Sequence, residues 1–339
     1  MNLSLPTSIK AAVLHDFKDL AKNLTIEQRP LPSLKQGQLL IRMAAASINP
    51  SDLVFLRHQY GIEKTLPVIP GFEGSGMVVQ SKAGWYGRWL IGKRVACHAP
   101  EAGDGTWAEY MVCTPRECMP LQKTVSLEQG ASLLINPFTA LLLLEKVRQK
   151  DHRAFVQTAA GSAVGKMLAR MASTQGIPAI HIVRRAEQAQ ELRAQGLKNV
   201  LDSSDPEFSH RLKTLATELN ASLLLDAVGG ALTGVITAAL PAGSEVLVYG
   251  ALSGEACSIN PTDFIFQKKS ISGFWLTDVL RTCPSIKKWT TLRRAQSLLS
   301  SDLATTVQAH YPLEKIHEAL QHYKMHRAKG KILLVYAKN

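Results

Sequence analysis

The pattern of hydrophobic and polar residues has one character up to about residue 120 and another from about residue 150. The first stretch contains short apolar runs with turn residues between them: "KAAVLHDF", "QLLIRMAAASI", "GSGMVVQSKA" and "GKRVACHA". Such runs are typical of β-strands. No helical repeat of useful length interrupts them before "SLEQGASLLINPFTALLLLEKV". The pattern therefore predicts a small β-rich domain.

From about residue 150, predicted strands alternate with predicted helices. Apolar runs such as "RAFVQTA", "PAIHIV" and "ASLLLDAV" are separated by amphipathic stretches such as "VGKMLARMASTQG" and "AEQAQELRAQG". The strands are nearly continuous apolar runs, as expected when both faces of a sheet are covered. This alternation favours a parallel sheet wound on both faces. Later, "KKSISGFWL" predicts a further strand, "PLEKIHEALQHYKMHRAKG" an amphipathic helix and "KILLVYA" a final strand.

The two patterns predict an α/β protein with two domains. A chain of 339 residues is too long for one simple core. We predict that residues 1–122 and 277–339 form a β-rich domain and that residues 123–276 form the doubly wound parallel-sheet domain.

Composition supports a globular protein, with 46% hydrophobic and 19% charged residues. No apolar run reaches the roughly 18 residues that span a bilayer. The N-terminal sequence lacks a basic start followed by an apolar core, so a signal peptide is not expected. We therefore predict a cytoplasmic protein without a membrane partner. Five cysteines at irregular spacing do not suggest a disulfide framework.

The formal net charge of +12 has three explanations: surface charge, a phosphorylated ligand or nucleic acid. The basic residues are spread along the chain, and we find no basic tail and no named nucleic-acid motif. Nucleic acid is therefore not expected as a partner.

A candidate phosphate loop lies in "VQTAAGSAVGKMLARMA", which runs from a strand through a turn of small residues into a helix. Small residues let the backbone approach a pyrophosphate, and the helix N-terminus supplies N–H donors. A tight turn without a ligand is the alternative, but the βα units that follow favour a dinucleotide. The turn has Ala159 where a glycine is usual. The candidate pyrophosphate-binding residues are Gly161, Ser162, Ala163, Val164 and Gly165.

The strand "PAIHIV" ends in Arg184 and Arg185. NAD-binding folds usually place a carboxylate there, to hold the ribose hydroxyl groups. Two guanidinium groups would instead attract a 2′-phosphate through charge-assisted hydrogen bonds. The pair therefore favours NADPH over NADH.

These features together resemble the medium-chain dehydrogenase/reductase superfamily over nearly the whole chain. Within it, the sequence is most similar to the zinc-free quinone oxidoreductases and the mitochondrial-type 2-enoyl thioester reductases. The matching residues are "NPSD" at 49–52, "PGFEGSG" at 70–76, "NPFTA" at 136–140, "SAVG" at 162–165, "VYGALSG" at 248–254 and "FIFQKKSISGFWL" at 264–276. The resemblance implies a β-rich GroES-like catalytic domain and a Rossmann-type dinucleotide-binding domain.

The resemblance also bears on zinc. Zinc dehydrogenases of this superfamily use a cysteine before the first-domain aspartate and a Gly-His-Glu block. Here Asn49-Pro50-Ser51 and Gly71-Phe72-Glu73 stand in those places, and serine and phenylalanine are not zinc ligands. Cys97, Cys113 and Cys118 are too few for the structural zinc lobe. We therefore predict no metal site.

Without a Lewis acid, hydride addition to a simple ketone is harder than addition to an activated alkene. The alkene reaction places charge on an enolate oxygen, which requires a hydrogen-bond donor and later a proton at the α-carbon. Tyr60 resembles the active-site tyrosine of the zinc-free branches, and packing alone is the alternative role. Tyr60 and Asn49 are the candidate catalytic residues, with Asn49 shaping the substrate pocket.

The resemblance implies further cofactor contacts. Asn136 would contact the cofactor at the domain junction, and Lys331 would lie near its polar groups. Residues that follow two strand ends would border the nicotinamide. These residues are Tyr249, Gly250, Ala251, Leu252, Phe274, Trp275 and Leu276. For Phe274 and Trp275, packing in the core or in a dimer interface is the alternative.

Three functions remain open at this point. They are an NADPH-dependent reductase of α,β-unsaturated carbonyls, including enoyl thioesters; an NADPH quinone reductase; and an NADPH-binding protein of low activity. The substrate would be a small enone, enoyl thioester or quinone. "SISGFWL" resembles an outer sheet strand that pairs with its copy, which predicts a homodimer.

Overall fold

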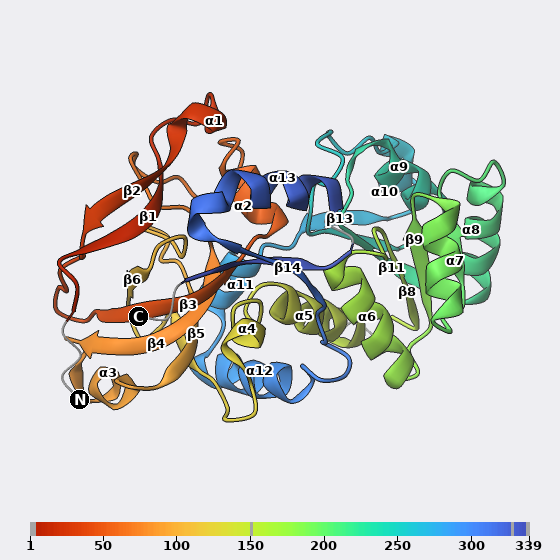
Figure 1. Cartoon of the computed structure of the whole chain (residues 1–339). Coiled ribbons are helices and arrows are strands. Elements are labelled where there is room, and N and C mark those ends of the chain that lie inside the picture. The colour runs from red at the N-terminus through yellow and green to blue at the C-terminus, as the bar shows by residue number, and fades with distance from the viewer. Residues whose placement is uncertain (1–4, 150–151, 327–328, 337–339) are drawn as a thin grey trace. The chain divides into compact units, whose positions relative to one another are not determined.

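The computed structural model describes residues 5–149, 152–326 and 329–336, and these form two compact units. The first unit contains the residues up to Ile135 and those from Thr305 onward, and the second runs from Asn136 to Ala304. Figure 1 shows strands dominating the first unit and helices around a parallel sheet in the second. The predicted α/β class, with a β-rich and a doubly wound domain, is confirmed.

The units divide the chain at different residues from the predicted domains. Residues 123–135 belong to the first unit, where Glu73 binds the backbone N–H groups at the end of this segment. Residues 277–304 belong to the second unit, where Lys287 forms an ion pair of 2.6 Å with Glu145. The hydrophobic pattern of the sequence gives no sign of these hydrogen bonds or of this ion pair.

The first unit contains a seven-stranded sheet and a separate two-stranded sheet, β1-β2. The main path of the larger sheet is β14-β15-β3-β4-β5-β7, and β6 pairs with β3. The strands are β1 (Ser8–Leu14), β2 (Leu24–Pro30), β3 (Leu39–Ser47), β4 (Glu73–Ser81), β5 (Arg94–His98), β6 (Tyr110–Cys113), β7 (Cys118–Pro120), β14 (Val307–Pro312) and β15 (Lys331–Val335). The helices are α1 (Leu20–Asn23), α2 (Pro50–Phe55), α3 (Gly84–Leu90), α4 (Leu127–Gly130), the 3₁₀ turn η1 (Leu313–Lys315) and α13 (Ile316–His326).

The register of β15, β3 and β4 brings distant residues together. Strand β3 pairs antiparallel with both neighbours, so that Leu333 lies opposite Ser47 and Gly74 lies opposite Ala46. The end of β3 therefore lies between the start of β15 and the start of β4. Polar residues at these three points are therefore placed side by side.

The second unit has a six-stranded parallel sheet in the order β10-β9-β8-β11-β12-β13. Renumbered within this unit, the order is that of dinucleotide-binding sheets, with the switch point between β8 and β11. The strands are β8 (Ala154–Gln157), β9 (Ala179–Val183), β10 (Val200–Asp202), β11 (Ala221–Asp226), β12 (Glu245–Val248) and β13 (Ser270–Gly273). The helices are α5 (Asn136–Gln149), α6 (Ala163–Thr174), α7 (Ala186–Ala194), α8 (Phe208–Glu218), α9 (Gly230–Ala239), α10 (Pro261–Ile265), α11 (Leu276–Thr282) and α12 (Ser285–Ser297).

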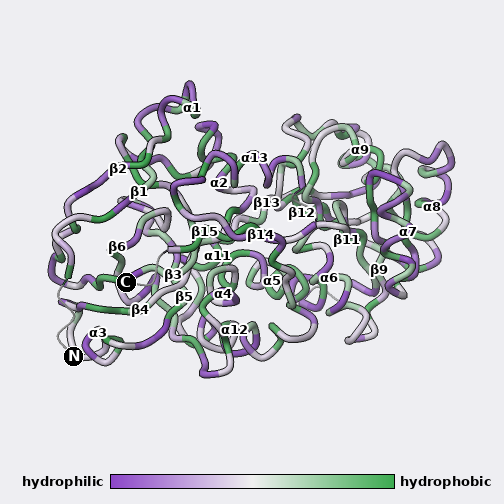
Figure 2. The backbone as a smooth tube through the Cα atoms, viewed as in Figure 1, coloured by the Kyte–Doolittle hydropathy of each residue, from purple (hydrophilic) through white to green (hydrophobic). Residues whose placement is uncertain are grey.

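Burial explains the pattern of the second unit. Every residue of β8 and β9 is buried, as expected for strands covered on both faces. Helix α5 is buried over most of its length, whereas α7 exposes most of its polar residues. Figure 2 shows the contrast, with hydrophobic colours on α5 and hydrophilic colours on α7.

Some predicted elements differ in length. The strand expected in "KKSISGFWL" covers only Ser270–Gly273, and α2 and α3 interrupt the strand-rich segment. Helix α13 ends at His326, and residues 327 and 328 of the predicted helix lie outside the described residues. Within the described parts of the chain, no helix has the length and apolar character needed to cross a bilayer.

Candidate active site

A buried polar cluster lies in the first unit where β3, β4 and β15 meet. Glu73, at the start of β4, is fully buried. Its Oε1 accepts hydrogen bonds from Ser47 Oγ at 2.7 Å and Asn49 Nδ2 at 3.0 Å. Its Oε2 accepts from the backbone N–H groups of Leu134 and Ile135, both at 3.0 Å. The carboxylate is thereby paired on both oxygens, as a buried charge requires.

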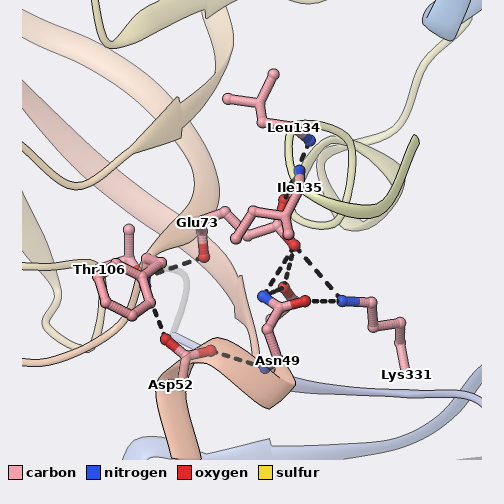
Figure 3. A network of polar contacts seen from close by, with 9 residues as sticks. Asn49, Asp52, Glu73, Thr106, Leu134, Ile135 and Lys331 are labelled. Atoms are coloured by element: carbon pink, nitrogen blue, oxygen red, sulfur yellow. Dashed lines mark hydrogen bonds and ion pairs between the residues drawn. The ribbon is translucent and has the colours of Figure 1, made fainter. Parts of the chain in front are cut away.

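Asn49 and Lys331 complete the cluster (Figure 3). The Lys331 Nζ donates to Asn49 Oδ1 and lies 3.5 Å from Glu73 Oε1. Asn49 Nδ2 also donates to Ser47 Oγ at 3.0 Å. The structure therefore brings together the predicted pocket residue Asn49 and the predicted cofactor residue Lys331, with their polar side-chain atoms bonded inside the first unit.

Asp52 links this cluster to helix α2. Its Oδ2 accepts from the backbone N–H of Asn49 at 2.7 Å, which caps the helix, and its Oδ1 accepts from the backbone N–H of Phe72 at 3.0 Å. Burial raises the pKa of Asp52 to about 7, although these hydrogen bonds and Lys331 oppose the shift. The protein thus holds a carboxyl group that titrates near neutral pH beside the contact between Lys331 and Glu73.

Burial also lowers the pKa of Lys331, while the nearby carboxylates of Glu73 and Asp52 oppose this shift. These opposing effects on the pKa of Lys331 show why the lysine is paired with carboxyl groups. An isolated ammonium would be costly in this apolar setting, and the two carboxyl groups offset that cost. The hydrogen-bonding groups of the cluster are used among themselves and on the backbone of Leu134 and Ile135.

Tyr60 is connected to this cluster by Phe72, on which its ring packs. It is half-buried, and its ring centre lies 4.8 Å from that of Phe72 at an angle of 43°. Phe72 packs edge-on against Phe55 of α2 at 5.6 Å. Because the backbone of Phe72 is held by Asp52, the aromatic wall under Tyr60 is tied to the buried carboxyl group. Sequence reasoning identified Tyr60 and Asn49 separately, and the structure connects them by this path.

Lys64 is a basic group that sequence reasoning did not select. Its Nζ lies 6.0 Å from the ring centre of Phe72 and donates to the Gly103 carbonyl oxygen at 2.8 Å. Burial lowers the pKa of Lys64 to about 8, against the attraction of Asp104 and Asp52. Lys64 and Asp104 also line a hollow of about 220 Å³. An ammonium so placed can bind an anionic or carbonyl group of a ligand.

The donor set does not fit a catalytic zinc ion. Zinc sites need three or four ligands of the cysteine, histidine or carboxylate type. Here Ser51 and Phe72 stand at the two predicted ligand positions, and both oxygens of Glu73 are bonded within the protein. Across the part of the chain that is described, no three His, Cys, Asp or Glu residues gather in a group suited to a metal. The absence of zinc remains a prediction.

The predicted phosphate turn lies at the carboxyl end of β8. Ser162 caps α6 by accepting from the backbone N–H of Gly165 at 3.1 Å. A Cβ atom on Gly165 would lie 2.5 Å from the carbonyl oxygen of Ala159, so only glycine fits where helix and turn approach each other. Ala159 itself has φ of +49°, the left-handed region where glycine is usual.

Arg184 and Arg185 follow β9 at the same edge of the sheet, and both are exposed. Arg185 is the N-cap residue of α7 but forms no side-chain cap. Neither guanidinium forms an ion pair with another residue in the described ranges. Both are therefore available to an anionic ligand.

A buried carboxylate at the carboxyl end of β11 was missed. Asp226 accepts from Thr158 Oγ1 at 2.7 Å and Thr233 Oγ1 at 2.6 Å, and from the backbone N–H of Val228 at 2.9 Å. Thr158 in turn accepts from the backbone N–H of Ala227 at 2.8 Å. The network fixes the edge of the sheet at the switch point. The only signal in the sequence was a lone acidic residue ending an apolar strand.

The segment after β12 packs on this network. The backbone N–H of Tyr249 donates to the Asp226 carbonyl oxygen at 2.8 Å, and that of Leu252 donates to the Ala227 carbonyl oxygen at 3.1 Å. Burial raises the pKa of Tyr249, and no described residue forms a hydrogen bond with its buried hydroxyl group. A buried hydroxyl group normally has a hydrogen-bond partner, because leaving it unpaired is costly.

The remaining predicted cofactor residues lie in the second unit. Phe274 is buried, and its backbone N–H donates to the Val248 carbonyl oxygen at 2.8 Å. Trp275 is the N-cap residue of α11, and Leu276 is half-buried. Asn136 begins α5 and is buried. The residues that follow β8, β9, β12 and β13 share the carboxyl edge of the sheet, whereas Asn136 and Lys331 lie elsewhere.

Comparisons with known proteins agree with this architecture. Residues 35–123 match the family described as alcohol dehydrogenase GroES-like domain, and residues 163–292 match the family described as zinc-binding dehydrogenase. A crystal structure from Mesorhizobium loti, assigned as an NADPH:quinone reductase, has 32% sequence identity and a TM-score of 0.89. The match covers 98% of this chain and 100% of that one.

Curated relatives include mitochondrial enoyl-[acyl-carrier-protein] reductases. The protein from Rattus norvegicus is 26% identical over 331 residues, which are 94% of this chain and 86% of that protein. The Arabidopsis thaliana protein is 29% identical over 256 residues, 73% of this chain and 66% of that protein. The chain belongs to the medium-chain dehydrogenase/reductase superfamily, and its relatives support a reductase of this superfamily.

Proposed function

We propose that the protein is an NADPH-dependent reductase of α,β-unsaturated carbonyl compounds, including 2-enoyl thioesters, and that it works without zinc. The observation that carries the proposal is the position of Tyr60, half-buried on Phe72 beside a cluster whose carboxylate is already paired. The likeness to enoyl reductases over most of the chain supports it.

Several residues fit a bound NADPH. Gly165 lets helix α6 pack directly on the phosphate turn, and the buried Tyr249 hydroxyl, which has no hydrogen-bond partner among the described residues, is a donor at the same sheet edge. Arg184 and Arg185 would hold the 2′-phosphate, which NADH lacks. When bound, the reduced nicotinamide supplies the hydride.

The protein's own residues would then manage the charge and the proton. Hydride arriving at the β-carbon of the substrate leaves negative charge on the carbonyl oxygen. The Tyr60 hydroxyl donates a hydrogen bond to this enolate or a proton to its α-carbon. Lys64 is placed to attract an anionic part of the substrate. Glu73, Asn49 and Lys331 hold the strand ends that carry this wall and take no part in proton transfer.

Quinone reduction is the second candidate function. The likeness to the Mesorhizobium loti protein, at 32% identity, specifically favours it. A quinone accepts hydride without an enolate that must be protonated at carbon, so Tyr60 would matter less for this reaction.

A substrate panel tests the proposal directly. Purified protein would be offered simple enones, enoyl thioesters and quinones, with NADPH oxidation followed by absorbance. We expect turnover with the enones or enoyl thioesters, and higher kcat/KM than with the quinones. Turnover of quinones alone would favour the second function. Tight NADPH binding without any turnover would favour a cofactor-binding protein.

We also propose a homodimer formed through β13. All four residues of this edge strand are exposed, and Ile271 is 40% exposed. An unpaired apolar edge invites association with a copy. Light scattering at micromolar concentration should give twice the mass of the 339-residue chain. Cytoplasmic location stays a prediction.

A further inference from the structure

Two histidines on α13 face the same hollow, outside the candidate active site. His322 and His326 are one helical turn apart, so their side chains project from one face of the helix. Their ring centres are 5.2 Å apart and the ring planes lie at 87°. Both are half-buried in an open hollow of about 320 Å³, lined by Tyr311, Glu318, Gln321, His322, Met325 and His326.

Tyr311 of β14 orients one of these rings. Its hydroxyl group lies 2.8 Å from Nδ1 of His322. When Nδ1 carries the hydrogen, the phenol oxygen accepts it, and Nε2 of His322 presents its lone pair to the hollow. Histidines that bind metals usually donate their other ring N–H to a carboxylate, a backbone carbonyl or water, which fixes the tautomer and the ring orientation, and the Tyr311 hydroxyl would take that place here.

The spacing of the rings suits one shared metal ion. Imidazole nitrogens bind zinc at about 2.0–2.1 Å, which puts two ring centres about 5 Å apart at a roughly tetrahedral angle. Among the described residues, no third His, Cys, Asp or Glu completes a three-ligand group. Glu318, one turn earlier, is 3.2 Å from Lys315 Nζ. Water would fill the remaining coordination positions.

We propose that His322 and His326 form a site for a divalent transition-metal ion of the imidazole-preferring class, with Tyr311 as a positioning residue. Copper(II) should bind most tightly, because it stands highest among these ions for nitrogen ligands. Magnesium should not bind, since it prefers oxygen ligands and retains its water. The hydrogen bond between Tyr311 and His322 links this site to β14, and the site is independent of the proposed reductase function.

The test is a titration of the untagged full-length protein with Cu²⁺, Zn²⁺ and Mg²⁺ by calorimetry. We expect one equivalent of Cu²⁺ and of Zn²⁺ to bind, and no Mg²⁺. His322→Gln and His326→Gln should each weaken Cu²⁺ binding at least tenfold. Tyr311→Phe should weaken it by about tenfold to a hundredfold. The Cu²⁺ electron paramagnetic resonance spectrum should show two nitrogen ligands in the wild type and in Tyr311→Phe.

His310→Gln is the matched control. His310 is exposed on β14 next to Tyr311, but adjacent residues of a strand point to opposite faces, and it lies 3.3 Å from Glu128. Its replacement should leave the affinity unchanged. Copper binding that is equal in all variants, or that falls as much in His310→Gln as in His322→Gln, would overturn the proposal. So would the absence of saturable binding of Cu²⁺ and Zn²⁺.

Discussion

The Nζ of Lys331 donates a hydrogen bond to the side-chain oxygen of Asn49, although 282 positions separate the two residues in the chain. The contact exists because β15 pairs with β3. It joins the last described strand of the first unit to the loop that begins α2. The two residues share Glu73 as a common partner.

Replacing this lysine should destabilise the protein strongly. Lys331→Met would leave the buried carboxylate of Glu73 without its counter-charge, and removal of one partner of a buried pair costs about 3–5 kcal/mol. We expect the free energy of unfolding to fall by that amount in denaturant titrations. Lys315→Met is the control: Lys315 is 55% exposed, and its pair with Glu318 should contribute less than about 1 kcal/mol. Equal losses in the two variants would show that the buried cluster has no special role.

Asp52 should give the protein a distinct pH dependence of stability. Its pKa is about 7 in the folded protein against an ordinary value of 3.8, so between these pH values the folded state holds a proton that the unfolded chain has released. The stabilisation that comes from this bound proton of Asp52 is therefore fully present below about pH 4 and is lost as the pH rises to 7. Each pKa unit corresponds to about 1.4 kcal/mol. Asp52→Asn should remove this decline, so parallel stability curves for the two proteins from pH 4.5 to 7.5 would contradict the assignment.

The phosphate turn offers a matched pair of glycines. Gly165→Ala puts a Cβ atom 2.5 Å from the carbonyl oxygen of Ala159, so the backbone must shift. Overpacking of this kind costs about 1–3 kcal/mol. Gly161→Ala meets only the side chain of Gln188, at 3.7 Å, and should be nearly neutral. Thermal unfolding without cofactor measures both, and a neutral Gly165→Ala would mean that helix and turn are not closely packed.

The arginine pair should determine the choice of cofactor. Replacing Arg184 and Arg185 together by alanine should weaken NADPH binding by a few kcal/mol, since hydrogen bonds between charged groups contribute about 1.5–3 kcal/mol each. NADH has no 2′-phosphate, and its affinity should change little. Fluorescence titration of both cofactors checks this expectation. Equal weakening would assign the arginines a role unrelated to the 2′-phosphate.

The arrangement of strands and helices could be predicted from the sequence, because hydrophobic periodicity records which faces are buried. The βα alternation after residue 150 gave the parallel sheet, and the turn from Ala159 to Gly165 lies where a phosphate loop was predicted, although its binding role stays a prediction. The order of the strands in the sheet could not be read from that pattern, because β8 and β11 lie side by side in the sheet but are not consecutive along the chain. The exact division between the units could not be read from the pattern either, and the first unit extends to Ile135, whose backbone N–H donates to Glu73.

The candidate site was predicted residue by residue, without its connections. Asn49 and Tyr60 were found by resemblance, but their link through Asp52 and Phe72 depends on backbone hydrogen bonds that leave no pattern in the sequence. Asp226 was missed because one carboxylate at a strand end has many possible roles. Lys64 was missed because its lowered pKa arises from burial in the folded protein.

The central claim concerns Tyr60 as the donor to the developing enolate. The most direct test compares the wild type with Tyr60→Phe on an enone and on a quinone, in steady-state assays with NADPH. If the hydroxyl acts in the transition state, the turnover number on the enone should fall by about 10²–10³-fold. The affinity for NADPH should stay nearly unchanged, and the quinone rate should fall much less. A Tyr60→Phe variant that reduces the enone as fast as the wild type would contradict the claim and leave Tyr60 as a packing residue.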